Sequence, residues 1–254
     1  MESTKYSKRE LAGKKIVLTR ASHQMKEFSE ELKKYGAISI EIPTIEIVPP
    51  LDHGERLRNA ISHLDDYEWI IFTSANGVDR FMSILQQVEE IEGVQVAAIG
   101  PRTQRKLEDF NVPVDLVPES HVAEGLLQIF PDAQTGSRVL LPRAAKARSI
   151  LPDTLIERGW LVDDVPAYRT TTPEVDEGSV QLLKSADAIV FTSSSTAQNF
   201  VKMYGKEHLP QVVVSIGPVT SQAIIDSGFV PTVEASPSSI EGIVQSLNEY
   251  YANI

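Results

Sequence analysis

The sequence predicts an α/β protein with parallel sheets, built from two similar halves. Short β-branched runs alternate with helical stretches along the chain, a pattern typical of parallel sheets covered by helices. The chain also repeats itself in order. Its 254 residues can bury one large core or two ordinary ones, because single cores stop growing near 250 to 300 residues. We therefore expect two domains.

The repeat has a long period. "IVLTR" at 16–20 matches "VLLPR" at 139–143, a spacing of 123 residues. The same spacing relates Gly36 to Gly159 and Ile45 to Tyr168. After a short deletion the matches continue with "FTS" at 72–74 and 191–193, "IGPRT" at 99–103 and "IGPVT" at 216–220, and "EGLL" at 124–127 and "EGIV" at 241–244. The order of the matching motifs is identical in both copies, as in an internal duplication.

Each copy has five candidate strands. In the first copy they lie near 16–20, 38–42, 69–73, 95–99 and 114–117, and in the second near 138–142, 161–165, 188–192, 211–216 and 230–233. Five strands alternating with helices fit a flavodoxin-like doubly wound sheet, in which ligands bind outside the carboxyl ends of the strands. We expect the polar turns after the strands to form the functional edge.

The domain boundary has two candidates. "PDAQTGS" at 131–137 separates the copies and resembles a linker. Two proline-bounded extended stretches, "IPTIEIVPP" at 42–50 and "VPAYRTTTP" at 165–173, are the alternative. If these two cross together, the lobes have exchanged strands. The pattern alone does not choose between them.

Polar turns follow several strands. In "FTSANG" and "FTSSST" a serine precedes each predicted helix, and "IGPRT" and "IGPVT" place Gly and Pro at the next helix starts. "SPSSIEG" suggests a capping box between Ser238 and Glu241. Helix N-termini bind anions through free N–H groups and the helix dipole. Simple capping explains any single turn, whereas several turns at one edge indicate a polyanion site.

A basic cluster, "RVLLPRAAKAR" at 138–148, contains Arg138, Arg143, Lys146 and Arg148 and no acidic residue. Arg143 has its repeat partner in Arg20, and both end a first strand, where a guanidinium can bind carboxylates. The alternative is a solvated helix start. Arg138 precedes the strand and is expected to be structural.

Tyr168 breaks the repeat, because its counterpart is Ile45. Two similar lobes cannot by themselves treat the two ends of an asymmetric substrate differently, so this position is a candidate for a directional proton donor. A neutral tyrosine can act as a general acid. Packing on an extended strand is the alternative.

Composition excludes several classes of function. The net charge of -11 argues against a nucleic acid partner, and no apolar run reaches the roughly 20 residues of a membrane span. The zero cysteines exclude disulfides and thiolate chemistry and agree with a reducing compartment. Asp163 and Asp164 are expected to precede a strand, away from the ligand edge. The histidines are scattered without helical ligand spacing, and we expect surface or capping roles for them. We expect a soluble, cytoplasmic protein without metal or cofactor.

The ordered motifs resemble the uroporphyrinogen-III synthase family from about Gly13 to Leu247. They are "VLTR", "FTSANGV", "AIGPRT", "LLPRAAKARSILPDTLIERGWLVDDVPAYRT", "VFTSSSTAQNF", "SIGPVT" and "SPSSIEGIVQSL". The resemblance implies a HemD-like fold: two flavodoxin-like doubly wound parallel-sheet lobes with exchanged strands, joined by a two-stranded crossing ladder. Lobe one would comprise 1–42 and 172–254, lobe two 50–163, and the crossing strands 43–49 and 164–171.

The resemblance also implies the reaction. A member of this family cyclises hydroxymethylbilane to uroporphyrinogen III, inverting the last pyrrole ring and losing water, without a cofactor. We expect a monomer, with transient contact with hydroxymethylbilane synthase. Tyr168 would be catalytic. Substrate binding would use Arg20, Thr73, Ser74, Gly100, Thr103, Arg143, Arg148, Ser193, Ser194, Gly217 and Thr220.

Two rival functions are considered beside this one. A non-catalytic two-lobed sensor could bind a carboxylated, tetrapyrrole-like ligand on the same fold. A flavin- or nucleotide-dependent enzyme is disfavoured, because no Gly-x-Gly-x-x-Gly or Walker A motif follows a strand.

Overall fold

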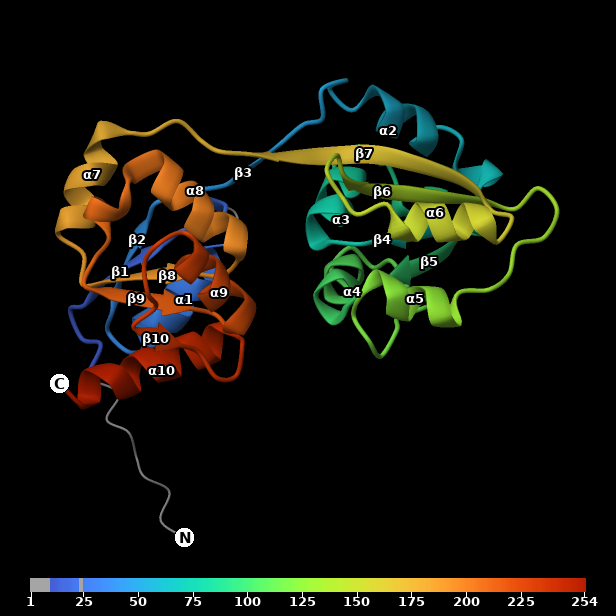
Figure 1. Cartoon of the computed structure of the whole chain (residues 1–254). Helices are drawn as coiled ribbons and strands as arrows, with labels where there is room; N and C mark the ends of the chain where they lie inside the picture. Colours follow the sequence, from blue (N-terminus) through green and yellow to red (C-terminus); the bar gives the residue numbers. More distant parts are fainter. Residues whose placement is uncertain (1–9, 23–24) are drawn as a thin grey trace, which may run out of the picture. The chain divides into compact units, whose positions relative to one another are not determined.

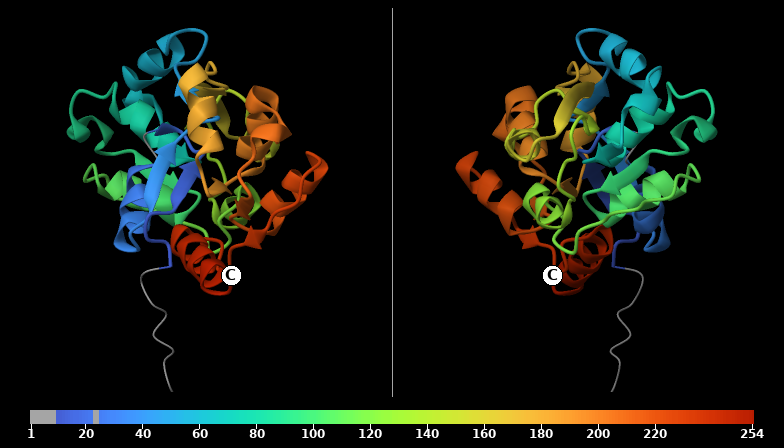
Figure 2. Two further views of the ribbon diagram at one scale, coloured as in Figure 1. Left: turned by 90° about the vertical axis from the view of Figure 1, so that its left-hand side faces the viewer. Right: turned by 90° about the vertical axis from the view of Figure 1, so that its right-hand side faces the viewer.

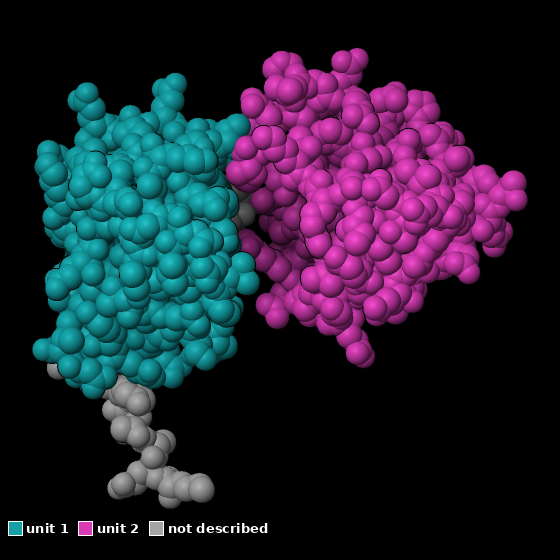
Figure 3. Space-filling model, in the orientation of Figure 1, with its two compact units in different colours: residues 1–46, 171–254 teal, residues 47–170 magenta. Residues whose placement is uncertain are grey.

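The computed structural model describes residues 10–22 and 25–254. His23, one of the scattered histidines, and the basic residues Lys5, Lys8 and Arg9 near the start of the sequence lie outside these ranges. The chain forms two compact units, coloured separately in Figure 3. Unit 1 combines Met1–Glu46 with Thr171–Ile254, and unit 2 is Ile47–Thr170. The predicted linker at 131–137 lies inside unit 2.

Unit 1 is a parallel sheet flanked by helices (Figure 1). Its elements are β1 (Lys15–Leu18), α1 (Lys26–Lys34), β2 (Ile38–Glu41), α7 (Glu177–Lys184), β8 (Ala188–Phe191), α8 (Ser194–Tyr204), the 3₁₀ turn η4 (Lys206–His208), β9 (Val212–Ser215), α9 (Pro218–Asp226), β10 (Val233–Glu234) and α10 (Ile240–Ala252). The strand order is β10-β9-β8-β1-β2, and every pairing is parallel. Counted along the unit this is the flavodoxin-like order 2-1-3-4-5.

Unit 2 contains the remaining elements. They are β3 (Glu46–Val48), whose first residue falls in unit 1, α2 (Glu55–Ile61), the 3₁₀ turn η2 (Leu64–Asp66), β4 (Trp69–Phe72), α3 (Ala75–Met82), the 3₁₀ turn η3 (Val88–Ile91), β5 (Gln95–Ala98), α4 (Pro101–Glu108), α5 (Ala123–Ile129), β6 (Arg138–Ala144), α6 (Ile150–Glu157) and β7 (Leu161–Thr171). The sheet order is β3-β7-β6-β4-β5. The pairings of β4 with β5 and β6, and of β6 with β7, are parallel.

The strands are exchanged between the two copies of the repeat. Unit 1 joins β1 and β2 of the first copy to β8, β9 and β10 of the second, and unit 2 joins β4 and β5 of the first to β6 and β7 of the second. The predicted fold class, two doubly wound parallel sheets with exchanged strands, is therefore confirmed.

Helices cover both faces of each sheet, and buried side chains form a core cluster on each face. Figure 2 gives two further views of the ribbon. In unit 1, Ile16 and Leu18 pack with α1 and α10, whereas Val17 and Ile189 pack with α7, α8 and α9. In unit 2, one face packs with α2, α3 and α4, and the other with α5 and α6. Strands covered on both sides read as continuous apolar runs, which is why "WIIF" and "AIVF" show no polar alternation.

Three local expectations were wrong. The stretch 114–117 forms only an isolated bridge, Ala97 to Leu116, because Pro118 lacks the N–H that would continue the ladder and the Asp115 carboxylate accepts the bond from the Val96 amide. Asp163 and Asp164 lie within β7, not before it. α10 is capped by Ser239, whose Oγ accepts from the Gly242 amide at 3.0 Å, so the predicted capping box at Ser238 does not form.

Within residues 10–22 and 25–254, no helix combines the length and apolar character that crossing a membrane requires.

Candidate functional site

The carboxyl edge of each sheet carries the starts of two helices that directly follow strands. In unit 2, α3 begins after Ser74 and α4 after Gly100. In unit 1, α8 begins after Ser193 and α9 after Gly217. Because parallel strands all end at the same edge, each unit presents its helix N-termini together. Each edge therefore offers several helix N–H groups to an anion.

Ser74 and Tyr168 meet at the edge of unit 2. Their hydroxyl oxygens are 3.0 Å apart, although the residues are 94 positions apart in sequence. Ser74 Oγ also accepts from the Gly77 amide at 3.2 Å, as the N-cap of α3. Tyr168 is only 7% exposed. The sequence predicted both residues for the site, and the structure brings them together.

A β-bulge places Tyr168. Along β7, Pro166 is opposite Arg143 and Tyr168 is opposite Ala144, so Ala167 is an extra residue in that strand. Regular alternation would put Ala167 and Tyr168 on opposite faces, yet both pack in the same core cluster. The Ala145 amide donates to the Tyr168 carbonyl at 2.8 Å and fixes the shifted register. Bulges commonly redirect a side chain next to an active site.

Arg143 has partners within unit 2. Its Nε and Nη2 donate to the two carboxylate oxygens of Asp164 at 2.7 and 2.5 Å, and its Nη1 donates to the Arg148 carbonyl at 2.6 Å. The side chain is 7% exposed. A bidentate pair of this kind is geometrically specific. Arg143 thereby holds the loop that ends at Arg148.

Arg148 is more accessible. Its side chain is 67% exposed, and its Nη1 and Nη2 donate to the two carboxylate oxygens of Glu124 at 2.8 and 3.2 Å. The Glu124 backbone N–H, followed by Arg148, lowers the pKa of the Glu124 carboxyl, so the pair is charged at neutral pH. Exposed pairs contribute little to stability. Arg148 can therefore leave Glu124 and pair with the carboxylate of a ligand at little cost in free energy.

A pocket of about 240 Å³ lies at this edge of unit 2. It contains three residues that the sequence predicted for binding, Thr73, Arg143 and Arg148. The other lining residues are Ile99, His121, Val122, Ala123, Ala147 and Leu151. His121 was not among the predicted binding residues. Its repeat relation to Ser238, beside the two glycine turns, is the signal that could have found it.

The remaining predicted residues lie at the carboxyl edges of the two sheets. Thr103 and Thr220 are buried in the first turns of α4 and α9. Ser193 Oγ accepts from the Thr196 amide at 3.4 Å, and Ser194 Oγ donates to the Val219 carbonyl at 3.5 Å. Arg20 is partly buried just after β1. Nothing in this geometry assigns a ligand atom to any of them.

The two glycine turns differ in the room that they leave for a side chain. A Cβ on Gly217 would lie 2.4 Å from Ser238 Oγ, whereas one on Gly100 would be in ordinary van der Waals contact with the His121 Cβ at 3.4 Å. The absence of a side chain at Gly217 thus lets the loop before α10 approach the start of α9 closely.

The amino edge of unit 2 is stabilised by a separate polar cluster. Arg138 forms an ion pair with Asp163 at 2.9 Å, and the Tyr67 hydroxyl donates to the same carboxylate at 2.6 Å. Burial, followed by the hydrogen bond to Asp163, raises the pKa of Tyr67 well above its ordinary value. Arg138 therefore contacts protein carboxylates at the edge away from the predicted site.

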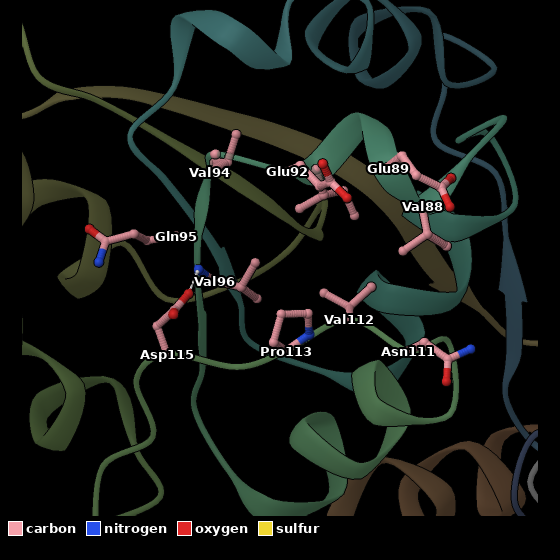
Figure 4. A pocket seen from close by; sticks show the side chains of 12 residues that line it. Val88, Glu89, Glu92, Val94, Gln95, Val96, Asn111, Val112, Pro113 and Asp115 are labelled. Carbon is pink, nitrogen blue, oxygen red and sulfur yellow. Dashed lines mark hydrogen bonds between the residues drawn. The ribbon is translucent and has the colours of Figure 1, made fainter.

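A larger pocket, of about 690 Å³, lies where η3, the start of β5 and the loop after α4 meet (Figure 4). Its lining combines apolar residues such as Val96 and Val112 with Glu89, Glu92 and Asp115. It contains none of the predicted site residues. Among the residues that the structure describes, no three histidine, aspartate or glutamate side chains are placed so that they could hold a metal ion together.

These features define a class of protein: a two-unit α/β protein with exchanged strands that presents helix N-termini and a serine–tyrosine pair at the carboxyl edges of its sheets. The family model described as uroporphyrinogen-III synthase HemD matches residues 26–245. The chain belongs to this family of enzymes, as the ordered motifs predicted.

Relatives and solved structures agree with this assignment. The uroporphyrinogen-III synthase of Synechococcus elongatus is 30% identical over 94% of this chain and 96% of its own length. That of Chlorobaculum parvum is 29% identical over 92% and 99%. Among solved structures, a mutant uroporphyrinogen III synthase from the extremely thermophilic bacterium Thermus thermophilus has a TM-score of 0.62 at 17% identity, covering 95% of this chain and 100% of its own. The enzyme from Helicobacter pylori has a TM-score of 0.63 at 19% identity, covering 93% and 99%. At these identities the structures support the fold.

The Arg143–Asp164 pair predicts a stability difference. Asp164→Asn leaves a nearly buried guanidinium without its carboxylate, and we expect it to lower the free energy of unfolding by about 1–3 kcal/mol. Glu124→Gln, which breaks the exposed pair with Arg148, is the control and should change it by less than about 0.5 kcal/mol. Both tryptophans, Trp69 and Trp160, lie in unit 2, so urea denaturation followed by tryptophan fluorescence reports on this unit. Equal effects of the two substitutions would contradict the prediction.

Proposed function

We propose that this chain cyclises hydroxymethylbilane to uroporphyrinogen III, with inversion of the last pyrrole ring and loss of water, in tetrapyrrole biosynthesis. The observation that carries the proposal is the contact of Tyr168 with Ser74, 3.0 Å at the carboxyl edge of unit 2, in a member of the uroporphyrinogen-III synthase family. Tyr168 is the position where the repeat is broken, and an asymmetric reaction needs such a position.

Tyr168 assists the departure of the substrate hydroxyl in this proposal. Its phenol donates a proton or a hydrogen bond to the leaving oxygen, which departs as water and leaves an azafulvene cation. Ser74 Oγ already accepts from the Gly77 amide, so its own hydrogen is available to Tyr168. A phenol that accepts this bond keeps its own hydrogen for the substrate. Ser74 is then the positioning residue for Tyr168.

The later steps need positioning more than chemical groups. The substituted carbon of the last ring attacks the cation and forms a spiro intermediate, which fragments and recloses with that ring reversed. The ring recloses through its other, unsubstituted α-carbon, and the proton on that carbon is lost at the end, so the proton donated to the leaving hydroxyl is balanced. The protein favours this route by holding the flexible chain away from simple head-to-tail closure.

Substrate carboxylates are bound, in this proposal, by the turns of both units. Unit 1 contributes Arg20, Ser193, Ser194, Gly217 and Thr220, and unit 2 contributes Thr73, Ser74, Gly100, Thr103, Arg143 and Arg148. An exposed helix N-terminus contributes only about 0.3–1 kcal/mol toward an anion. Affinity therefore requires many contacts, and a chain with a net charge of -11 can bind a polyanion if the contacts are local.

The two arginines of unit 2 contribute differently. Arg148 reaches the substrate by exchanging Glu124 for a substrate carboxylate, because its pair is exposed. Arg143 keeps Asp164 and contributes through the Arg148 carbonyl that it holds. We propose further that the protein works as a cytoplasmic monomer and receives its substrate in transient contact with hydroxymethylbilane synthase. The absence of cysteine supports a reducing compartment.

The isomer formed from hydroxymethylbilane tests the function directly. The purified protein should direct formation of the type III isomer, separable by chromatography from the type I isomer that forms without enzyme. Type I alone, together with saturable tetrapyrrole binding, would replace this proposal with the non-catalytic sensor.

Tyr168→Phe removes the phenol oxygen and keeps the ring. We expect the turnover number for type III formation to fall by about 10²-fold or more, with KM changed less than about threefold, because the hydroxyl acts on the leaving group. Steady-state kinetics on hydroxymethylbilane measure both. An unchanged turnover number would return Tyr168 to a packing role.

Ser74→Ala and Ser193→Ala form a matched pair, since each removes the N-cap side chain of the helix after an "FTS" turn. Both should lower stability by about 1 kcal/mol. Of these two serines, Ser74 is the one that contacts Tyr168, so we expect Ser74→Ala to lower the turnover number and Ser193→Ala to raise mainly KM. Equal loss of turnover in both variants would remove the positioning role of Ser74.

A further inference from the structure

His121 lies on the loop that leads into α5 and lines the pocket of about 240 Å³ at the carboxyl edge of unit 2. Scattered histidines in this sequence suggested only surface or capping roles. The pocket places His121 with Thr73, Arg143 and Arg148, three residues of the proposed substrate site. A histidine in that position can donate or accept a hydrogen bond, and the proposed function assigns it no such role.

The hydrogen bond of His121 fixes its tautomer. Nδ1 lies 3.0 Å from the Pro118 carbonyl oxygen. A carbonyl oxygen can only accept, so Nδ1 carries the hydrogen in this contact. In the neutral ring the other nitrogen, Nε2, then has a lone pair and no hydrogen. His121 is therefore a hydrogen-bond acceptor held in place by the backbone of its own loop.

The pocket wall matches one particular kind of group. Ile99, Val122, Ala123 and Leu151 provide apolar surface, and Arg148 lies at the same pocket with an exposed guanidinium. A volume of about 240 Å³ is below the range of pockets that enclose a whole drug-sized ligand, so it takes only part of a larger one. A pyrrole ring has flat apolar faces, one N–H donor and, in this substrate, acidic side chains.

We propose that this pocket binds one pyrrole ring of the substrate, with the ring N–H donating to Nε2 of His121 and a carboxylate of the same ring on Arg148. The inference rests on the proposed function for the identity of the substrate. Arg143 stays paired with Asp164 and holds the Arg148 backbone, while Glu124 gives up Arg148 to the substrate. His121 is then a specificity-determining residue that recognises pyrrole N–H.

The repeat shows that the equivalent place in unit 1 has a different side chain. The counterpart of His121 is Ser238, and the two lie beside the equivalent turns at Gly100 and Gly217. A serine hydroxyl is shorter than an imidazole and both donates and accepts. Only unit 2 therefore has an imidazole acceptor at this place, in the unit that also contains Tyr168. Two positions at which the repeat is broken, Tyr168 and His121, thus lie in one unit.

Two substitutions test the hydrogen-bond acceptor at Nε2 of His121 separately from the hydrogen bond of Nδ1. His121→Asn keeps an N–H near Nδ1 for the Pro118 carbonyl but loses the acceptor at Nε2. His121→Gln places an amide oxygen near the position of Nε2. His63→Asn is the matched control, because His63 Nδ1 also contacts a main-chain carbonyl, that of Asn59 at 2.9 Å, at the amino edge of the unit.

The experiment measures KM and turnover number for type III formation from hydroxymethylbilane with the full chain. We expect His121→Asn to raise KM about three- to tenfold, the loss of one hydrogen bond, with the turnover number within about twofold. His121→Gln should stay within about twofold of the unsubstituted protein in both constants, and so should His63→Asn. Unfolding midpoints measured alongside show that all variants are folded.

The inference is overturned if His121→Asn leaves KM unchanged, or if His121→Gln raises KM as much as His121→Asn does. Either result in a protein that still forms the type III isomer leaves the proposed function intact. An unsubstituted protein that forms only the type I isomer refutes the proposed function instead.

Discussion

The parallel direction of the strands is the constraint on which the rest of this structure depends. Helices that cross over the faces of each sheet join strands that run in the same direction. Every helix that directly follows a strand therefore begins at the same edge of the sheet. That edge gathers Ser74 and Tyr168, residues 94 positions apart in the chain. It also gathers helix N–H groups in a chain whose net charge is -11. Anion binding in the proposed function therefore relies on local dipoles more than on an overall positive charge.

The second constraint is the free-energy cost of burying the charge of Arg143. Arg143 is held nearly buried by Asp164, and a guanidinium in that position is costly unless its hydrogen bonds are satisfied. The pair satisfies two of its donors, and the Arg148 carbonyl satisfies a third. The basic cluster thus divides its roles: Arg138 binds protein carboxylates at the amino edge, Arg143 fixes a loop, and Arg148 stays accessible at the carboxyl edge.

Sequence patterns predicted the elements better than their contacts. The apolar runs "WIIF" and "AIVF" and the serines that follow them located two strands and two helix starts correctly. The pattern failed at 114–117, where an aspartate side chain replaces a ladder bond, and at Ser238, one residue before the true cap. It also misplaced Asp163 and Asp164, which lie inside β7 because that strand begins at Leu161.

The sequence by itself determined the repeat, the polar turns after the strands, the family and the break in the repeat at Tyr168, because each of these is written in local residue order. Only the tertiary structure decided which strands share a sheet, which arginine is paired with Asp164, and that Tyr168 contacts Ser74. Those facts depend on pairings between residues far apart in the chain. A repeated sequence is equally compatible with exchanged and unexchanged pairings, and the preference between them lies in packing that no local pattern records.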